Sequence, residues 1–307
     1  MIVIEENKEY SLIGKIDSLN HGETWANLSL LLEDGTKQTV KITPDLISNF
    51  HVNGLYYFEL IGALREDKPY LKVTNFKTIF EYAENDELER ILRIFYDYSP
   101  ISQNELKTQI YDFINDINNQ TINMIVNKIM NKHKDDFFIY PAATRFHHTF
   151  ISGLAYHTLT MLKLSKGFFD IYPYLNKDLV YAGIILHDMG KIYELSTPFG
   201  PEYTVDGGLI GHLALESNEL MIEASKLNIE KKEEILLLNH MILSSHGRPE
   251  FGSCHKPMIP EAYLLWYLDT IDSKFTVMGM KLEEVCEGEF TDPISVLEKN
   301  KIYKHML

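Results

Sequence analysis

The sequence predicts two domains of different structural class: a small β-barrel at the N-terminus and an all-helical domain after it. Two observations support this prediction. Over residues 1–80, apolar residues alternate with polar ones in short segments, which is the period of a half-buried strand. From about Glu81 the apolar spacing becomes that of amphipathic helices, and it stays so to about residue 280. The 307 residues are enough to bury a core in each domain.

Five segments within residues 1–80 alternate as strands do, and turn residues separate them. The Asp34-Gly35 pair carries a hairpin signal, and a short helix is expected near residues 44–49. Five short strands with a helical insert are typical of an OB-like barrel, an architecture that binds oligonucleotides and oligosaccharides. A structural β-module without a ligand is the alternative. The expected strands are residues 10–16, 25–32, 39–42, 56–62 and 70–73.

The composition restricts the partners. With 29 Lys and Arg against 44 Asp and Glu, the formal net charge is −15, whereas a protein that holds nucleic acid by bulk electrostatics is normally basic. Nucleic-acid binding would therefore need a local groove, bound metal cations or base stacking. Four aromatic residues on the expected barrel strands could stack on bases. They are Trp25, Tyr56, Tyr57 and Tyr70.

Neither a membrane span nor a secretory signal is expected. No apolar run approaches the roughly 20 residues of a transmembrane helix, and the N-terminus turns acidic at Glu5. The two cysteines, Cys254 and Cys286, cannot form a disulfide framework and lack the CxxC spacing of metal sites. The cytoplasm is therefore the expected location. The sequence is compatible with assembly into a homo-oligomer.

The helical part is expected to have three segments. Residues 81–139 form a helical connector, residues 140–280 form the main helical domain, and residues 281–307 form a C-terminal tail. Pro173 and Gly190 are among the residues that divide the main domain into separate helices.

Two histidines and two aspartates are expected on buried faces of three helices. His157 falls on an apolar helical stripe. An almost wholly apolar helix, residues 179–186, runs directly into His187-Asp188, and Asp269 shares a face with the apolar residues of a later helix. A buried carboxylate is costly unless it is paired or metal-bound. Each histidine alone could be an ordinary core residue, but the set forms a shell suited to Mn²⁺, Fe²⁺, Co²⁺ or Zn²⁺ rather than Ca²⁺.

Further histidines could hold a second ion, so that one or two ions are expected. His212 begins an apolar-periodic helix, and His246 follows the end of another. Asp188 has two oxygens and could bridge two ions, with His212 and His246 holding the second. His240 could be a ligand, a residue that orients a ligand, or part of the core.

The order His157, His187-Asp188, Asp269 resembles the HD-domain superfamily of metal-dependent phosphohydrolases. The similarity is closer still to the YhaM-type 3′–5′ exoribonucleases of Gram-positive bacteria, and it is more specific over about 140–303 than over 1–80. The runs that carry the resemblance are residues 140–143, 147–148, 152–157, 181–184, 202–205, 211–212, 242–247 and 287–291.

The resemblance implies an all-helical HD domain that hydrolyses RNA, fed with single-stranded RNA by an OB-like barrel. It also implies Mn²⁺ as the preferred cofactor and a 3′–5′ direction. Two features depart from the family pattern. Ser245 stands where the family usually has the first of two histidines before a glycine, which removes one potential ligand. Residues 1–80 carry eight basic against eleven acidic residues, which weakens the expectation of strong RNA binding there.

Phosphodiester hydrolysis needs a nucleophile at neutral pH and positive charge at the phosphoryl oxygens, and a divalent metal supplies both. Asp188 is the expected bridge between metals. Lys191 could stabilise phosphate charge as a second catalytic residue, or it could be a solvated surface lysine. Four residues could line the substrate entrance, with an ordinary surface role as the alternative. They are Arg145, His147, His148 and Arg248.

The signatures of a P-loop, HExxH, GxSxG and Rossmann glycines are absent from the sequence. The leading hypothesis is a metal-dependent 3′–5′ exoribonuclease acting on single-stranded RNA, with single-stranded DNA as a further substrate. One alternative is an HD phosphohydrolase of free nucleotides or cyclic dinucleotides. Another is a non-catalytic RNA-binding protein.

Overall fold

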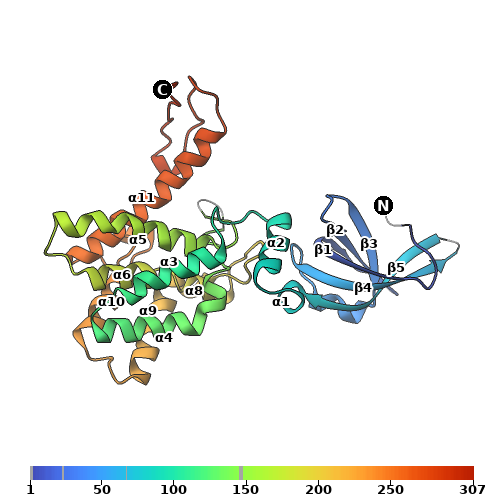
Figure 1. Ribbon diagram of the computed structural model, residues 1–307, viewed down its shortest axis with the longest axis horizontal. Coiled ribbons are helices and arrows are strands. Elements are labelled where there is room, and N and C mark those ends of the chain that lie inside the picture. Colours follow the sequence, from blue (N-terminus) through green and yellow to red (C-terminus); the bar gives the residue numbers. More distant parts are fainter. Residues whose placement is uncertain (1–2, 23, 67, 145–147) are drawn as a thin grey trace. The chain divides into compact units, whose positions relative to one another are not determined.

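The computed structural model describes residues 3–22, 24–66, 68–144 and 148–307. The chain divides into two compact units, Met1–Asp97 and Tyr98–Leu307. The first contains a β-barrel and the second is helical (Figure 1), which confirms the predicted order of a β-domain and a helical region. The first unit also includes helices α1 (Ile79–Tyr82) and α2 (Asn85–Phe95). Within the described ranges, no helix combines the length and apolar character needed to cross a membrane.

Five strands close the barrel in the order β1-β2-β3-β5-β4. β3 and β5 pair in parallel, with Val40 opposite Leu71, whereas the other pairs are antiparallel. The predicted short helix is the 3-10 helix η1 (Pro44–Asn49), between β3 and β4. The strands are β1 (Glu9–Asn20), β2 (Ala26–Leu31), β3 (Lys37–Ile42), β4 (Leu55–Arg65) and β5 (Lys68–Thr78).

The first strand is longer than its alternating pattern indicates because it serves two neighbours. Residues from Glu9 to Lys15 pair with β4, and residues from Lys15 to Asn20 pair with β2. The register with β2 shifts between Ile16 and Ser18. An irregularity of this kind bends a strand and increases its twist, which lets β1 turn from one side of the barrel to the other.

Two of the predicted base-stacking tyrosines are neighbours on β4 and point in opposite directions. Tyr56 is 4% exposed, its ring lies 5.0 Å from that of Phe50, and its hydroxyl donates to the carbonyl of Asn49. The prediction that Tyr56 stacks on bases is therefore wrong, because strand alternation turns this ring into the barrel core. Tyr57 points outward and stacks on Tyr82 of α1.

The other two predicted aromatic residues, Trp25 and Tyr70, lie on the outer barrel surface, and each has a lysine ammonium over its ring. The ammonium of Lys72 lies 5.4 Å from the ring centroid of Trp25, and that of Lys41 lies 4.4 Å from the ring centroid of Tyr70. Lys41 and Lys72 are opposite one another in the β3–β5 pair. Adjacent strands therefore present two aromatic rings and two cations together.

The second unit is built around α6 (Lys177–Leu186), in which every residue from Leu179 to Leu186 is buried. α6 contacts α4, α5, α10 and α11, which explains why its sequence is apolar on all sides. The other helices are α3 (Gln103–Asn115), α4 (Gln120–Phe137), α5 (Gly153–Ile171), α7 (Lys191–Glu194), α8 (Val205–Ile210), α9 (His212–Lys226), α10 (Glu233–Leu243) and α11 (Pro260–Glu283).

A close backbone approach follows the end of α6. A Cβ added to Gly190 would lie 2.2 Å from the carbonyl oxygen of His212, so only glycine lets the α6–α7 turn lie against the start of α9. This approach brings His187 and Asp188 next to His212.

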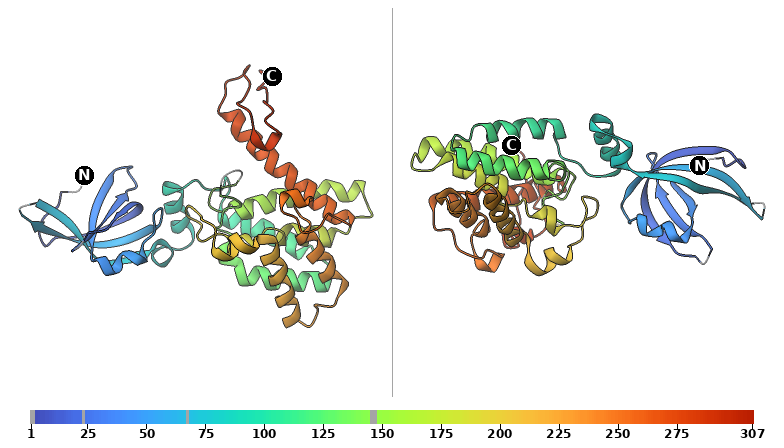
Figure 2. Two further views of the ribbon diagram at one scale, coloured as in Figure 1. Left: turned by 180° about the vertical axis from the view of Figure 1, so that it is seen from behind. Right: turned by 90° about the horizontal axis from the view of Figure 1, so that it is seen from below.

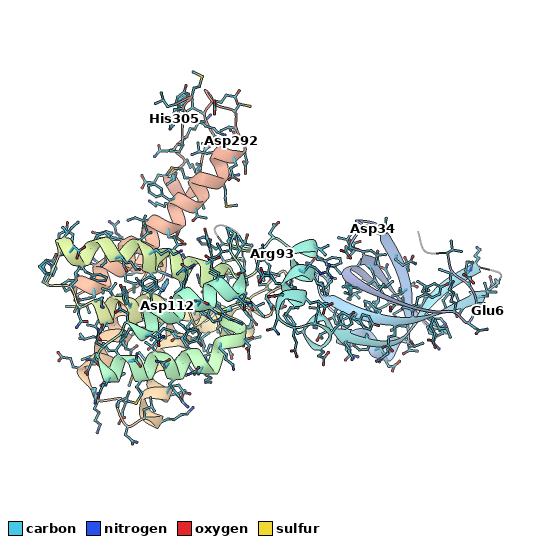
Figure 3. The ribbon with its side chains drawn as sticks, viewed as in Figure 1. Glu6, Asp34, Arg93, Asp112, Asp292 and His305 are labelled. Atoms are coloured by element: carbon cyan, nitrogen blue, oxygen red, sulfur yellow. The ribbon has the colours of Figure 1, made fainter. Side chains whose placement is uncertain are left out.

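The last helix passes through the helical unit and then continues beyond it. The first half of α11 packs on α5, α6 and α10, whereas its second half and the residues after it extend away from the other helices (Figure 2). The tail doubles back on itself, with Phe290 paired to Tyr303 and Ile294 paired to Asn300. Asp292 and His305 lie in this extension (Figure 3).

Candidate metal centre

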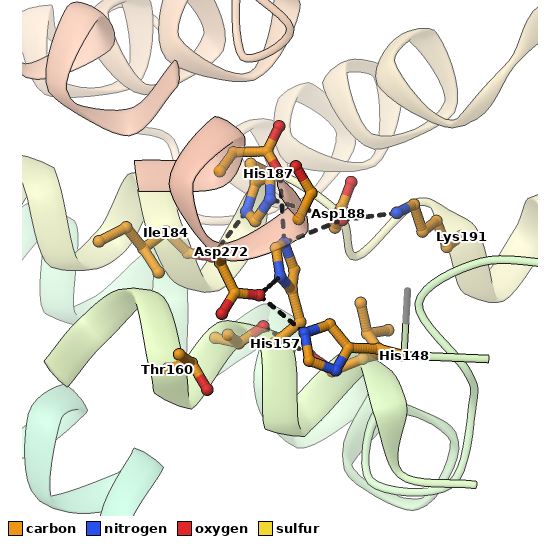
Figure 4. Close-up of polar contacts among 12 residues, drawn as sticks. His148, His157, Thr160, Ile184, His187, Asp188, Lys191 and Asp272 are labelled. Atoms are coloured by element: carbon orange, nitrogen blue, oxygen red, sulfur yellow. Dashed lines mark hydrogen bonds and ion pairs between the residues drawn. The ribbon is translucent and has the colours of Figure 1, made fainter. Parts of the chain in front are cut away.

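The first group of predicted ligands meets inside the helical unit, where α5, α6 and α11 converge. The side-chain donor atoms of His157, His187 and Asp269 all lie within 4.8 Å of one another. Nε2 of His157 is 3.4 Å from Oδ1 of Asp269 and 3.7 Å from Oδ2 of Asp188. Both histidines are fully buried and Asp188 is 3% exposed. Figure 4 shows His157, His187 and Asp188 turned toward one another.

The second group contains Asp188, which also lies beside the histidines of the first group. Asp188, His212 and His246 also place donor atoms within 4.8 Å of one another. Oδ2 of Asp188 lies 3.4 Å from Nε2 of His187, whereas Oδ1 lies 3.5 Å from Nε2 of His212. The two oxygens of one buried carboxylate therefore face two different sets of histidines.

Three of these histidines are held by a hydrogen bond at the opposite ring nitrogen. Nδ1 of His187 donates to the carbonyl of Ile184 at 2.8 Å. Nδ1 of His157 donates to Oδ2 of Asp272 at 2.6 Å, and Nδ1 of His212 donates to Glu194 at 3.1 Å. Such partners fix the ring and direct the Nε2 lone pair toward a metal.

Asp272 and Glu194 were not predicted as part of the site. Asp272 lies three residues after Asp269 on α11, so the helical spacing that placed Asp269 on a buried face could have placed Asp272 near it. Glu194 ends the four-residue helix α7, and a helix this short carries no periodicity from which its partner could be read.

The donor set fits a divalent cation. Among the described residues, Nε2 of His187, Nε2 of His212 and Oδ1 of Asp188 are buried and have no hydrogen-bond partner. Buried polar atoms are nearly always paired, so these three atoms in and beside the two ligand groups are suited to hold a cation. Imidazole nitrogens together with carboxylate oxygens suit transition metals and zinc.

The charges around Asp188 keep it ionised. Burial opposes ionisation, but Lys191 and the neighbouring histidines hold the pKa of Asp188 well below its usual range. Burial lowers the pKa of His187, which favours the neutral imidazole that metals bind. Burial also opposes protonation of His157, yet hydrogen bonds to Asp269 and Asp272 raise its pKa to about 10. A cation bound at His157 therefore displaces a proton.

Lys191 and His148 lie beside the centre. The ammonium of Lys191 donates to Oδ2 of Asp188 at 2.7 Å. His148 is 2% exposed, and its Nε2 donates to Oδ2 of Asp272 at 2.7 Å. His148 was expected at an open substrate entrance, but the turn before α5 brings it inward. A Cβ on Gly153 would lie 2.0 Å from the His148 carbonyl.

The remaining predicted residues lie elsewhere or outside the described part of the chain. His240 belongs to neither ligand group, and its Nε2 accepts a hydrogen bond from the backbone N–H of Met258. Arg248 is exposed. Arg145 and His147 fall outside the described residues.

A cavity of about 550 Å³ is lined by Lys191 and Glu194 together with Ala143 and Tyr203. This volume is within the usual range for small-molecule sites. Two of its lining residues contact the ligand groups, because Lys191 bonds to Asp188 and Glu194 bonds to His212.

These features define the class of protein: a β-barrel unit joined to a helical unit with a buried His/Asp centre suited to divalent metal. The chain is 43% identical over 234 residues to the 3′–5′ exoribonuclease YhaM of Bacillus subtilis, which is 76% of this chain and 73% of that protein. It is 44% identical over 210 residues to the YhaM of Bacillus licheniformis, 68% of this chain and 67% of that protein. The chain belongs to the YhaM family of 3′–5′ exoribonucleases, which confirms the predicted family.

Two further comparisons add little. No family model matches the chain. A solved structure of a replication protein A heterotrimer bound to single-stranded DNA covers 28% of this chain and 66% of its own, with 8% identity and a TM-score of 0.22. That likeness is too weak to support an argument about fold or function.

Proposed function

We propose that this protein is a metal-dependent 3′–5′ exoribonuclease that hydrolyses the phosphodiester bonds of single-stranded RNA, and of single-stranded DNA as a secondary substrate. Membership of the YhaM family supports the activity. The position of Asp188 is the observation that carries the mechanism, because its two oxygens face two separate groups of histidines.

We assign the helical unit as an HD domain with two ligand sets. The first set is His157, His187 and Asp269 with Asp188 beside them, and the second is Asp188, His212 and His246. Mn²⁺ is the preferred ion of the proposal, and Co²⁺, Fe²⁺ and Zn²⁺ suit the same donors. Asp188, His212 and His246 would hold the second ion.

A divalent ion at this centre supplies a nucleophile at neutral pH and neutralises charge on the phosphoryl oxygens. The protein side chains position these events. Asp272 and Glu194 hold the rings of His157 and His212. Lys191 adds a cation within 2.7 Å of Asp188 and also lines the 550 Å³ cavity. A phosphate in that cavity would therefore meet positive charge from Lys191.

The barrel suits capture of single-stranded RNA as an OB-like domain. Its five strands close into a barrel, with the short helix η1 between β3 and β4, as the OB-like prediction requires. The outer faces of β3 and β5 carry Lys41 and Lys72 opposite one another, next to Tyr70 and Trp25. Aromatic rings stack on bases of any sequence and lysines attract the backbone, so this face compensates for the acidic charge of the chain as a whole.

The cytoplasm is the proposed location. Cys254 and Cys286 are exposed free cysteines, and free thiols suit a reducing compartment. Assembly into a homo-oligomer stays a prediction.

The test is a digest of 5′-labelled single-stranded RNA by the Mn²⁺-loaded protein. A 3′–5′ exoribonuclease yields a ladder of labelled products that shorten with time, and EDTA stops it. Immediate release of the labelled terminal nucleotide would contradict the direction. Turnover of free nucleotides or cyclic dinucleotides without RNA cleavage would favour the other phosphohydrolase activity. RNA binding without any turnover would indicate a non-catalytic protein.

Asp188→Ala should abolish turnover. Asp170→Ala is a matched control, because Asp170 is exposed on α5, the helix that carries His157. Retained activity in the Asp188→Ala protein would contradict the assignment.

A further inference from the structure

A second cavity, of about 410 Å³, lies beside the second ligand set. Its walls include Arg248, Glu250 and Lys256 from the segment after α10, and Tyr263 and Trp266 from α11. The cavity is large enough for a small ligand. Arg248 is the one residue of this cavity that the sequence predicted at the substrate entrance, and none of the cavity's residues is used in the function proposed above.

The cavity is close to the metal centre along two segments of the chain. Gly247 and Arg248 directly follow His246, a member of the second ligand set. Trp266 lies three residues before Asp269 on α11, which corresponds to a rise of about 4.5 Å along the helix axis. A group bound here would thus be a neighbour of a group bound at the centre.

One wall of the cavity is aromatic. Trp266 stacks with Tyr267, with ring centroids 5.0 Å apart and an interplanar angle of 22°. The rings of Tyr263 and Trp266 are 6.4 Å apart. Tyr263 and Tyr267 are 44% and 51% exposed, respectively. Tyr263 and Trp266 line the cavity, whereas Tyr267 is not among its lining residues and packs on Trp266. Two aromatic rings in one wall offer a surface for planar ligands.

The orientation of the indole is fixed by the backbone. Gly247 has φ +74°, and a Cβ placed there would lie 2.0 Å from the Trp266 ring. Only glycine therefore lets the loop after His246 lie against the indole while adopting this conformation. A preorganised ring loses less conformational entropy when a ligand stacks on it.

Two other side chains of the cavity, Arg248 and Lys256, carry positive charge. The Arg248 guanidinium lies 6.0 Å from the Trp266 ring centroid. Arg248 and Lys256 are exposed and form no ion pair within the described part of the chain. They outnumber the single acidic residue of the cavity, Glu250. Local positive charge of this kind is notable in a chain whose net charge is −15, because it permits phosphate contact there.

We propose that this cavity is a nucleobase subsite: Trp266, supported by Tyr263, stacks on one base of the RNA substrate near the cleaved bond, and Arg248 and Lys256 contact the adjoining backbone phosphates. The inference rests on the proposed exoribonuclease function and adds the side chains that hold the strand in register. Stacking accepts every base, so the subsite holds the strand without selecting a sequence.

The test combines an enzyme variant with a substrate variant. The Mn²⁺-loaded full chain is given 5′-labelled RNA of ten nucleotides in which one abasic ribose is moved stepwise from the 3′ end. At the position served by the subsite, the wild-type protein should lose kcat/KM by about 5- to 150-fold, the range expected for one stacked base. Trp266→Leu, which retains apolar bulk beside Gly247 but cannot stack, should show the same loss on intact RNA and no further loss at that position.

Two variants complete the test. Trp266→Phe keeps an aromatic ring and should retain the position-dependent loss. Tyr174→Ala removes an aromatic side chain that is 68% exposed in the same unit and lines neither cavity, so it should behave as wild type. If the losses in kcat/KM caused by Trp266→Leu and by the abasic ribose multiply at every position, Trp266 does not stack on a base. The subsite is then rejected, while the proposed function stands. If the wild-type protein cleaves no RNA, both are overturned.

Discussion

Oδ2 of Asp272 lies 2.6 Å from Nδ1 of His157, and both groups are buried inside the helical unit. Asp272 also accepts a hydrogen bond from His148. The carboxylate therefore fixes the side of the His157 ring that faces away from Asp188 and Asp269. Carboxylates in this position orient a ligating histidine and strengthen its binding to metal.

Asp272→Asn should weaken metal binding without removing a ligand. We expect the Mn²⁺ concentration for half-maximal activity to rise about 10- to 100-fold, the usual effect of losing such a partner, with activity largely restored at saturating Mn²⁺. The measurement is kcat/KM on single-stranded RNA across a Mn²⁺ titration. Asp170→Asn, on the exposed face of α5, is the control. An unchanged Mn²⁺ requirement would show that Asp272 does not orient His157.

Glu194→Gln should affect the second ligand set in particular. Glu194 accepts from both Nδ1 and the backbone N–H of His212, and neither contact reaches His157 or His187. Isothermal titration with Mn²⁺ should show one binding step weakened about 10- to 100-fold and the other unchanged. Glu202→Gln is a matched control in the same cavity wall. Equal weakening of both Mn²⁺-binding steps would contradict the assignment of two separate ligand sets.

Lys191→Met should reduce turnover more than metal affinity. The Lys191 ammonium contacts Asp188 and faces the 550 Å³ cavity, where it can meet a phosphate oxygen. Loss of one preorganised charge near a reacting group typically costs about 100- to 1,000-fold in kcat. Single-turnover assays at saturating Mn²⁺ measure this loss. A kcat within a few-fold of wild type would leave Lys191 only a structural role.

Glu216 should make the folded state less stable as the pH rises. Burial raises the pKa of Glu216 well above its usual range, and nearby Glu219 adds to the effect. Both Glu216 oxygens lack a hydrogen-bond partner within the described ranges. Above about pH 4.3 the folded chain thus keeps a proton on Glu216 that the unfolded chain has released. Unfolding therefore releases a proton, and the free energy of unfolding falls as the pH rises. The fall is up to about 1.4 kcal/mol per pH unit and ends once the pH passes the pKa of Glu216 in the folded state.

Urea unfolding at several pH values between 5 and 8, in EDTA, measures this dependence. Glu216→Gln should flatten the decline, because the amide has no proton to lose. Glu283→Gln, at an exposed position near the end of α11, should leave it unchanged. A decline that is as steep in Glu216→Gln as in wild type would show that Glu216 is not its source.

Much of the site could be predicted because its ligands follow helical periodicity. His157 lies on an apolar stripe, and the wholly apolar α6 places His187 and Asp188 at a buried helix end. Periodicity does not show which residue of another segment forms a hydrogen bond with each ligand histidine. Asp272 and Glu194 act through histidines 115 and 18 residues away in sequence. Helical spacing can place Asp272 on a buried face, but it cannot identify His157 as its partner.

The wrong predictions for His148 and Tyr56 also arise from contacts between segments that the sequence pattern does not contain. His148 was expected to be open to substrate, but a turn with positive φ at His148 and Ser152 folds it under α5. Tyr56 and Tyr57 are adjacent on β4, and only the closure of the barrel decides which of them faces the core. Sequence pattern thus gives the alternation of a strand or the stripe of a helix, and tertiary closure determines which face is covered.

The most direct measurement of the central claim is a crystal structure of the Mn²⁺-soaked protein with anomalous diffraction at the manganese edge. We expect two peaks about 3.5–4 Å apart, one on each side of the Asp188 carboxylate, with His157 and His187 at one and His212 and His246 at the other. A single peak, or peaks that do not touch Asp188, would contradict it.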